Sequence, residues 1–147
     1  MKFYIEPMEQ RHIDRIYDIE MRSFSVPWGY DMLVSELDNP YSMGIVVYIA
    51  DEIAGYATMR HIINEGHIGN IAVAPEHRGR GVGNALIEKL LQIAKDMNMI
   101  GITLEVGINN AAAQRLYTKN GFVFEGIRKN YYAGTGEDAI IMWKYLT

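Results

Sequence analysis

The stretch from Asn70 to Leu86 constrains this chain more than any other. It starts with a short apolar run, Ile71 to Val73, that is typical of the end of a buried strand, and Pro75 then stops the strand because proline cannot donate to a sheet ladder. Three glycines follow between positions 79 and 83. A helical spacing of apolar residues comes next, at Leu86, Leu90, Ile93, Ala94 and Met97. The order strand, glycine-rich turn and helix predicts outward-pointing backbone N–H groups at the positive end of a helix dipole, where a phosphate can bind.

The kind of phosphate is narrowed by what the turn lacks. A dinucleotide fingerprint would place Gly-x-Gly-x-x-Gly directly after the strand, and a Walker A loop would need Gly-Lys-Ser/Thr; neither occurs in this sequence. The order is Arg78, Gly79, Arg80, Gly81, one further residue and Gly83. Taken alone, the stretch also fits a plain turn that caps a helix, so other motifs have to decide between the two interpretations.

Composition bounds the class of protein. With 147 residues, 49% of them hydrophobic and 22% charged, the sequence predicts one globular domain over residues 1–147. No apolar run approaches the roughly 18 residues of a membrane span, and the first residues lack the apolar core of a signal peptide, so we expect a cytoplasmic protein that does not bind membranes. The absence of cysteine excludes thiolate metal sites and a cysteine nucleophile, and no metal is expected. A net charge of -4 argues against nucleic-acid binding and suits an amine-bearing substrate.

Hydrophobic periodicity predicts a mixed α+β chain. Strands are expected at residues 2–6, 43–50, 53–63, 67–73, 100–106, 122–132 and 137–145. Helices are expected from about residue 9, from 31 to 39, from 82 to 97, and from 109 or 110 to 120. The hairpin-linked strands predict an antiparallel meander, and the strand–helix–strand unit around the glycine turn predicts two parallel strands joined by a right-handed crossover.

The first helix carries a carboxylate on its apolar side. Its expected stripe consists of Ile13, Ile16, Tyr17, Met21 and Phe24. Glu20 falls on the same stripe, where it either pairs with an arginine or caps another group, or lines a site for an amine.

An aromatic loop follows this helix. Pro27 and Gly29 break the helical pattern, and Asp31 is expected to cap the second helix. Phe24, Trp28 and Tyr30 stand in or beside the break. The loop either folds over the core as a lid or forms one wall of a substrate cleft, and the two interpretations are compatible.

Two side chains in the second half are candidates for acid–base chemistry. Ile102, Leu104 and Val106 share one face of a strand, which places Glu105 on the other face. Glu105 is either a general base or a member of a structural ion pair. Tyr117, in the following helix, is either a general acid or a core residue.

The motifs together resemble the GNAT superfamily of acetyl-CoA-dependent N-acetyltransferases. The pyrophosphate loop of that family, Arg/Gln-x-x-Gly-x-Gly/Ala, is matched at Arg78, Gly81 and Gly83. Asn109 to Ala112, Leu116-Tyr117 and Gly121-Phe122 are similar to its C-terminal half. The segments 126–132 and 137–143 resemble the branch that acetylates the N-terminal alanine of a small-subunit ribosomal protein.

This resemblance implies a fold and a set of roles. The fold is a mixed, mostly antiparallel sheet of about seven strands, with two central parallel strands splayed apart and about four flanking helices. Glu105 would be the base and Tyr117 the acid. Acetyl-CoA would be held by Ile71, Ala72, Val73, Arg78, Gly79, Arg80, Gly81, Val82, Gly83, Asn84 and Asn110. A protein N-terminus would be held by Glu20, Phe24, Trp28, Tyr30, Tyr131 and Tyr132. The enzyme would be a monomer or weak dimer.

One position departs from the branch pattern. Members of the branch often carry arginine directly after Leu-Glu-Val, whereas this chain has Gly107. Acceptor selectivity is therefore open, and a small amine or a lysine side chain is an alternative acceptor on the same fold. A non-catalytic acyl-CoA sensor is a third interpretation, which the presence of both Glu105 and Tyr117 disfavours.

Overall fold

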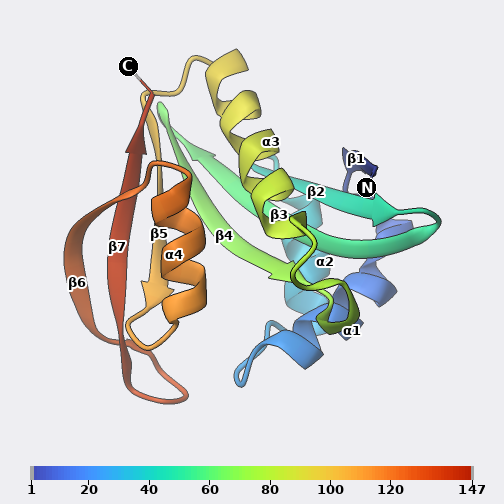
Figure 1. Ribbon diagram of the computed structural model, residues 1–147, viewed down its shortest axis with the longest axis horizontal. Helices are drawn as coiled ribbons and strands as arrows, with labels where there is room; N and C mark the ends of the chain where they lie inside the picture. The colour runs from blue at the N-terminus through green and yellow to red at the C-terminus, as the bar shows by residue number, and fades with distance from the viewer. Residues whose placement is uncertain (1, 147) are drawn as a thin grey trace.

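The computed structural model describes residues 2–146. Seven strands, four α-helices and two 3-10 helices make up this part of the chain (Figure 1). In chain order they are β1 (Phe3–Pro7), η1 (Gln10–His12), α1 (Ile13–Ser23), α2 (Tyr30–Asp38), β2 (Ser42–Ile49), β3 (Glu52–Ile62), β4 (Glu65–Val73), η2 (Pro75–His77), α3 (Val82–Asp96), β5 (Gly101–Gly107), α4 (Ala111–Lys119), β6 (Val123–Tyr132) and β7 (Glu137–Tyr145).

The strands form one mixed sheet in the order β1-β2-β3-β4-β5-β7-β6. Strands β4 and β5 run parallel, and the other neighbouring pairs are antiparallel. The helix α3 makes the crossover between the two parallel strands, as the strand–helix–strand pattern predicts. The predicted fold is therefore confirmed, including the parallel pair at its centre.

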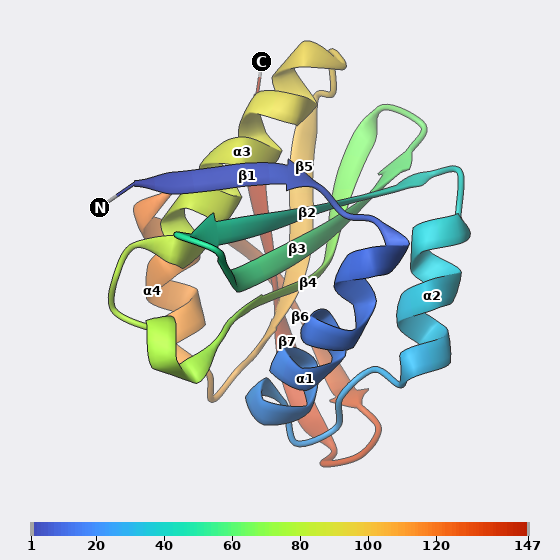
Figure 2. The same ribbon diagram turned by 90° about the vertical axis from the view of Figure 1, so that its right-hand side faces the viewer.

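The helices cover the two faces of the sheet (Figures 1 and 2). Alternate residues of a strand point to opposite faces, so neighbouring residues of β2 enter different cores. Val46 packs with the apolar side of α1 and with Leu33 of α2, whereas Val47 packs with Leu86 and other residues of α3. The two cores lie on either side of the central strands, so the sheet is packed on both faces.

The phase of α1 differs from the sequence prediction. Ile13, Ile16 and Ile19 are fully buried, whereas Met21 is 50% exposed. Ile19 and Glu20 turn toward the sheet, which rotates Met21 out of the interface. Phe24 lies beyond the helix as its C-cap and packs from the loop.

The start of α2 also differs from the prediction. Its N-cap is Gly29, and Asp31 lies inside the first turn, where a carboxylate interacts favourably with the helix dipole. Likewise, Pro75 does more than end β4, because it opens the short helix η2 before the glycine turn.

Candidate active site

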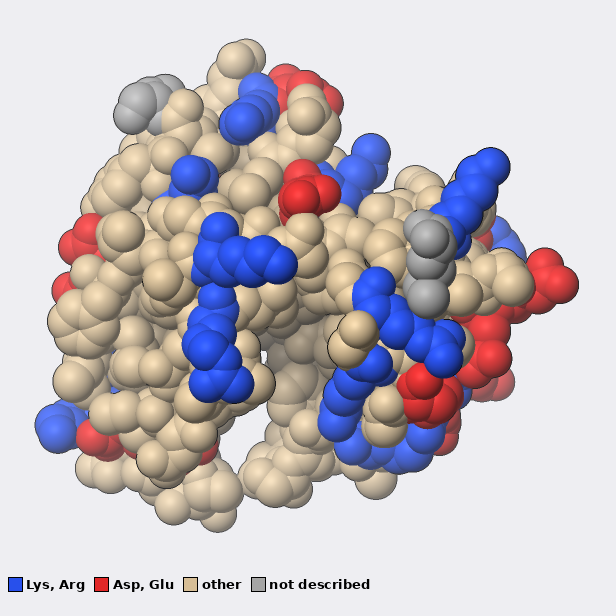
Figure 3. Space-filling view, viewed as in Figure 1, with Lys and Arg blue, Asp and Glu red and all other residues tan. Residues whose placement is uncertain are grey.

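The parallel strands separate soon after they pair. The parallel ladder joins Glu65–His67 of β4 to Gly101–Thr103 of β5 and then stops, although both strands continue. A register shift in the β3–β4 ladder falls just after this point, beside Gly69. Figure 3 shows the molecule hollowed between the two separated parts. This is the splay that the family resemblance implies, and Ile71 and Val73 lie on its β4 side.

The glycine turn stands at one end of this cleft. Gly79 and Gly81 have positive φ angles of 77° and 86°, which glycine adopts without the steric penalty of other residues. Gly81 is the N-cap of α3, so the N–H groups of Val82, Gly83 and Asn84 begin the helix with no acceptor inside it. The turn therefore has the geometry of an anion site.

Gly83 has a packing role that the sequence does not reveal. A Cβ at this position would lie 3.0 Å from Leu116 Cδ2 on α4. The neighbouring Asn84 accepts a hydrogen bond from Asn120 Nδ2 at 3.0 Å. The start of α3 thus packs closely against α4, and a side chain at position 83 would need Leu116 to move by a few tenths of an ångström irrespective of any bound phosphate.

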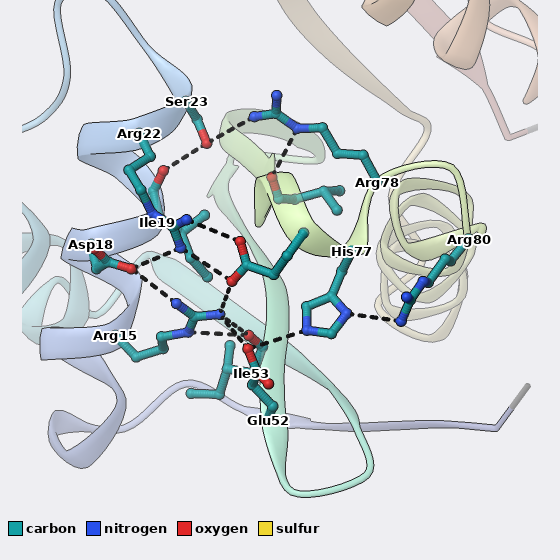
Figure 4. Close-up of polar contacts among 12 residues, drawn as sticks. Arg15, Asp18, Ile19, Arg22, Ser23, Glu52, Ile53, His77, Arg78 and Arg80 are labelled. Carbon is teal, nitrogen blue, oxygen red and sulfur yellow. Dashed lines mark hydrogen bonds and ion pairs between the residues drawn. The ribbon is translucent and has the colours of Figure 1, made fainter.

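The two arginines of the turn are held by different groups (Figure 4). Arg78 donates to the carbonyl of Val73 at 3.2 Å and to Ser23 Oγ of α1 at 3.4 Å. Arg80 Nη1 lies 3.3 Å from Nδ1 of the buried His77. In Figure 3, basic side chains gather on both sides of the hollow, over α4 and over the turn before α3.

Below the turn, an ion-pair network fixes η2 to α1 (Figure 4). Arg15 and Arg22 both donate to Glu76 at 2.9 Å, and these bonds hold the pKa of the Glu76 carboxyl well below its usual range. Glu52, Glu76 and His77 bring potential metal-ligand atoms within 4.8 Å of one another. Both carboxylates already contact Arg15, so the charges of this cluster are balanced by arginine.

Glu105 and Tyr117 lie on the other side of the cleft, on β5 and α4. The Glu105 side chain is 21% exposed and Arg128 Nε lies 3.4 Å from its Oε1. Tyr117 is buried and packs edge-on against Phe122, with 5.7 Å between ring centroids. Burial raises the pKa of Tyr117, so its hydroxyl keeps its proton at neutral pH. If Glu105 has the structural role of one half of an ion pair, Arg128 is its partner.

Tyr131 and Tyr132 stand next to these two groups. Their rings contact each other edge-on at 5.0 Å. Burial, followed by the charges of Tyr131, Glu137 and Glu105, raises the pKa of Tyr132 to about 12. The predicted base and the predicted tyrosine wall are therefore brought together at the end of β5.

The aromatic loop is divided between two positions. Trp28 covers Gly69, where an added Cβ would lie 3.1 Å from the indole ring, and this places Trp28 beside the departing β4 strand. Phe24 packs with the α1–α2 core. Tyr30 bonds Asp14 of α1 at 2.9 Å, so its hydroxyl is held on the α1 side.

The loop also meets the β6–β7 turn. A Cβ on Gly134 would lie 2.3 Å from Val26 Cγ2, so the two segments are in direct contact. Figure 2 shows the α1–α2 loop and the β6–β7 turn side by side at the end of the sheet. This contact bridges the open ends of the separated strands, and the hollow becomes a passage.

Glu20 lies in the interior. It is 1% exposed, and its carboxylate accepts hydrogen bonds from Tyr56, from Asn70 Nδ2 at 2.6 Å and from the Trp28 backbone N–H at 2.8 Å. The Glu20 carboxylate thus caps the backbone N–H of Trp28, which agrees with the capping interpretation, and none of these three partners is an arginine.

Asn110 and Gly107 follow the end of β5. Asn110 caps α4 by accepting from the Ala113 N–H at 3.1 Å, which decides between the two caps that the sequence allows, Asn109 and Asn110. At Gly107, an added Cβ would lie 2.8 Å from Glu137 Oε2, and the same oxygen accepts from the Asn109 N–H at 2.9 Å. Glu137 thus fills the space that a side chain at 107 would need. Periodicity could not show this, because it depends on the pairing of β5 with β7.

Comparisons with known proteins agree with this geometry. The model of the acetyltransferase (GNAT) family matches residues 13–122. A Bacillus subtilis (strain 168) protein, provisionally assigned as a [ribosomal protein bS18]-alanine N-acetyltransferase, is 39% identical over 143 residues, covering 97% of this chain and 95% of its own.

Two solved structures are also similar. The ribosomal-protein-S18-alanine N-acetyltransferase from Escherichia coli has a TM-score of 0.92 and 30% identity, with 99% of this chain and 95% of that chain covered. A Bacillus anthracis acetyltransferase in complex with acetyl coenzyme A has a TM-score of 0.81 and 26% identity, with 100% of both chains covered. Among the described residues, no helix is both long enough and apolar enough to cross a membrane.

Proposed function

The chain belongs to the GNAT family of acetyltransferases, and we propose that it transfers an acetyl group from acetyl-CoA to the free N-terminal amine of a protein. The proposed acceptor is an N-terminal alanine of a small-subunit ribosomal protein in the cytoplasm. Two relatives carry that activity in their names, and both are covered over more than nine-tenths of their length.

One observation carries the proposal. The separated strands β4 and β5 leave a cleft with an anion-binding turn on the β4 side, while the Glu105 carboxylate of β5 and the buried Tyr117 of α4 lie on the other side. Acyl transfer to an amine needs this set of groups: a held donor, a base, an oxyanion donor and an acid.

The donor side fits a pyrophosphate. The N–H groups after Gly81 and the guanidinium groups of Arg78 and Arg80 supply hydrogen bonds and positive charge. Nothing lies within 4 Å of an added Cβ at Gly79, so the outer face of the turn is open. From Ile71 to Val73, β4 still pairs with β3 but no longer with β5, so its β5-facing edge offers backbone groups to an extended arm and an N–H to the oxyanion.

The acid–base roles follow from where the charges must go. An N-terminal ammonium has a pKa of about 7.7–8.0, so it must lose a proton before it can attack, and Glu105 takes that proton. The N–C bond forms, the C–S bond breaks, and the departing sulfur receives the Tyr117 proton. The second proton that the acylated nitrogen loses then restores the Tyr117 hydroxyl. Since the chain has no cysteine, attack is direct, in a ternary complex.

The acceptor side of the cleft suits the N-terminus of an extended peptide. Trp28 on one side and Tyr131-Tyr132 on the other can flank an extended peptide. The contact between Val26 and Gly134 encloses the entrance, so an acceptor enters end-on. A small first side chain suits such a passage.

The test is an acceptor comparison. A peptide that begins with Ala should be acetylated faster than the same peptide beginning with Leu or Glu, and N-terminal blocking should abolish transfer even when lysines are present. Mass spectrometry locates the acetyl group. Acetyl on lysine, or faster acetylation of spermidine than of any peptide, would replace this proposal with the small-amine or lysine alternative.

A further inference from the structure

The buried Glu20 carboxylate is bonded on every side by donors. Tyr56 donates its hydroxyl, Asn70 its amide and Trp28 its backbone N–H. These partners come from three elements, β3, β4 and the α1–α2 loop, while Glu20 itself belongs to α1. One carboxylate therefore joins four segments that are distant in sequence.

The groups that Glu20 holds lie at the point where the cleft opens. Asn70 follows Gly69, the residue beside the register shift in β4, and Trp28 covers Gly69 with its ring. The same loop touches the β6–β7 turn through Val26 and Gly134. Any movement of the loop at Trp28 would change the wall of the passage and its closure together.

Glu20 itself does not reach the passage. With 1% of its surface exposed and three internal hydrogen bonds, the carboxylate has no surface left for an acceptor amine. Burial raises its pKa, which the three donors oppose. Burial of a carboxylate held only by neutral donors costs free energy. In this protein the three hydrogen bonds that compensate for the burial also fix the position of the loop.

We propose that Glu20 is a positioning residue of the acceptor site: its carboxylate fixes the Trp28 loop to Asn70 and so sets the width of the acceptor passage. This inference rests on the proposed function only in assigning the passage to the acceptor. It replaces the sequence-based assignment of Glu20 as a direct substrate contact.

The substitution Glu20→Gln tests the hydrogen-bond logic at nearly constant shape. All three partners donate to the carboxylate. The amide NH2 group of the glutamine would face at least one of them, so two donors would point at each other and that hydrogen bond would be lost. Loss of one charge-assisted hydrogen bond changes the equilibrium constant of the process it stabilises on the order of tenfold. Glu36→Gln is the matched control, because Glu36 is also buried but is bound by Arg60 at 2.9 and 2.8 Å.

The first readout is hydrogen exchange in the free protein, followed by mass spectrometry of the segment 24–30. Glu20→Gln should speed exchange there on the order of tenfold, and Glu36→Gln should not. Unchanged exchange in Glu20→Gln, or an equal change in Glu36→Gln, would overturn the inference. This readout needs no acceptor, so it stands even if the proposed function fails.

The second readout is steady-state kinetics with the best amine acceptor. Glu20→Gln should raise the KM for the acceptor on the order of tenfold and leave acetyl-CoA affinity within about twofold. In the double variant Glu20→Gln/Asn70→Asp, the amide NH2 at position 20 donates to a carboxylate at position 70. This variant should therefore recover part of the loop's protection from hydrogen exchange. A double variant with exchange as fast as Glu20→Gln would contradict the pairing.

Discussion

Replacing Glu105 by glutamine separates the two roles that its geometry allows. The amide keeps the shape and can still accept from Arg128, whose Nε lies 3.4 Å away. Since this pair is partly exposed, its loss should cost no more than about 1 kcal/mol of unfolding free energy. The variant should therefore fold, with a melting temperature within about 4 °C of the parent.

The expected loss of turnover at neutral pH is about 10²- to 10⁴-fold, the usual contribution of a positioned general base. For an acceptor amine with a pKa of about 7.8, the neutral fraction rises about sevenfold between pH 7 and pH 9. The deficit of Glu105→Gln relative to the parent should narrow by up to that factor. The measurement is kcat/KM for an Ala-starting peptide across this pH range, with acetyl-CoA saturating.

Arg128→Ala is the control, because it breaks the ion pair and keeps the carboxylate. It should leave turnover within a few-fold of the parent. If Arg128→Ala loses as much activity as Glu105→Gln, or if the Glu105→Gln deficit is equal at every pH, the ion-pair interpretation is correct and the base assignment is refuted.

Two further outcomes concern the acid and the network under the glycine turn. Tyr117→Phe should lower kcat by about 10²-fold or more with acetyl-CoA affinity unchanged by calorimetry, since only the departing sulfur needs the proton; an equal loss in both would place Tyr117 in donor binding. The pKa of Glu76 is lowered in the folded state by Arg22 and Arg15, so its stabilising effect is full above the unfolded pKa of about 4.5 and is lost as pH falls toward the folded value. Glu76→Gln should therefore make the melting temperature less sensitive to pH below about 4.5, and an unchanged slope would contradict this.

The elements that could be predicted are those whose signal is local. Alternation and helical spacing placed the strands and α3, and the glycine turn with Asn110 placed the helix starts on the cleft side. The phase of α1 was wrong because Met21 and Ile19 both fit a helical stripe, and only packing against Val46 and the other sheet residues decides which is buried.

The partners of the site residues were beyond the sequence for a different reason. The site residues are contacted from other strands: Glu105 by Arg128, Gly107 by Glu137 and Glu20 by Tyr56. Such contacts depend on strand pairing, for example on Glu105 lying opposite Ile141 of the closing hairpin. Spacing along the chain carries no information about such pairs. The one signal used for the buried cluster is Glu20 itself, a carboxylate on the apolar stripe of the first helix, and its partner Asn70 is identified only by the structure.

The helix α1 connects the two ends of the cleft. On one side Arg15 and Arg22 hold Glu76 beneath the glycine turn, and the Ser23 hydroxyl accepts a hydrogen bond from Arg78. On the other side Glu20 holds the α1–α2 loop through the backbone N–H of Trp28. Because a helix of 11 residues is stiff, a shift of α1 would move the turn and the loop together. If the glycine turn binds the donor and the passage binds the acceptor, as proposed, one helix supports both sites and sets the distance between them.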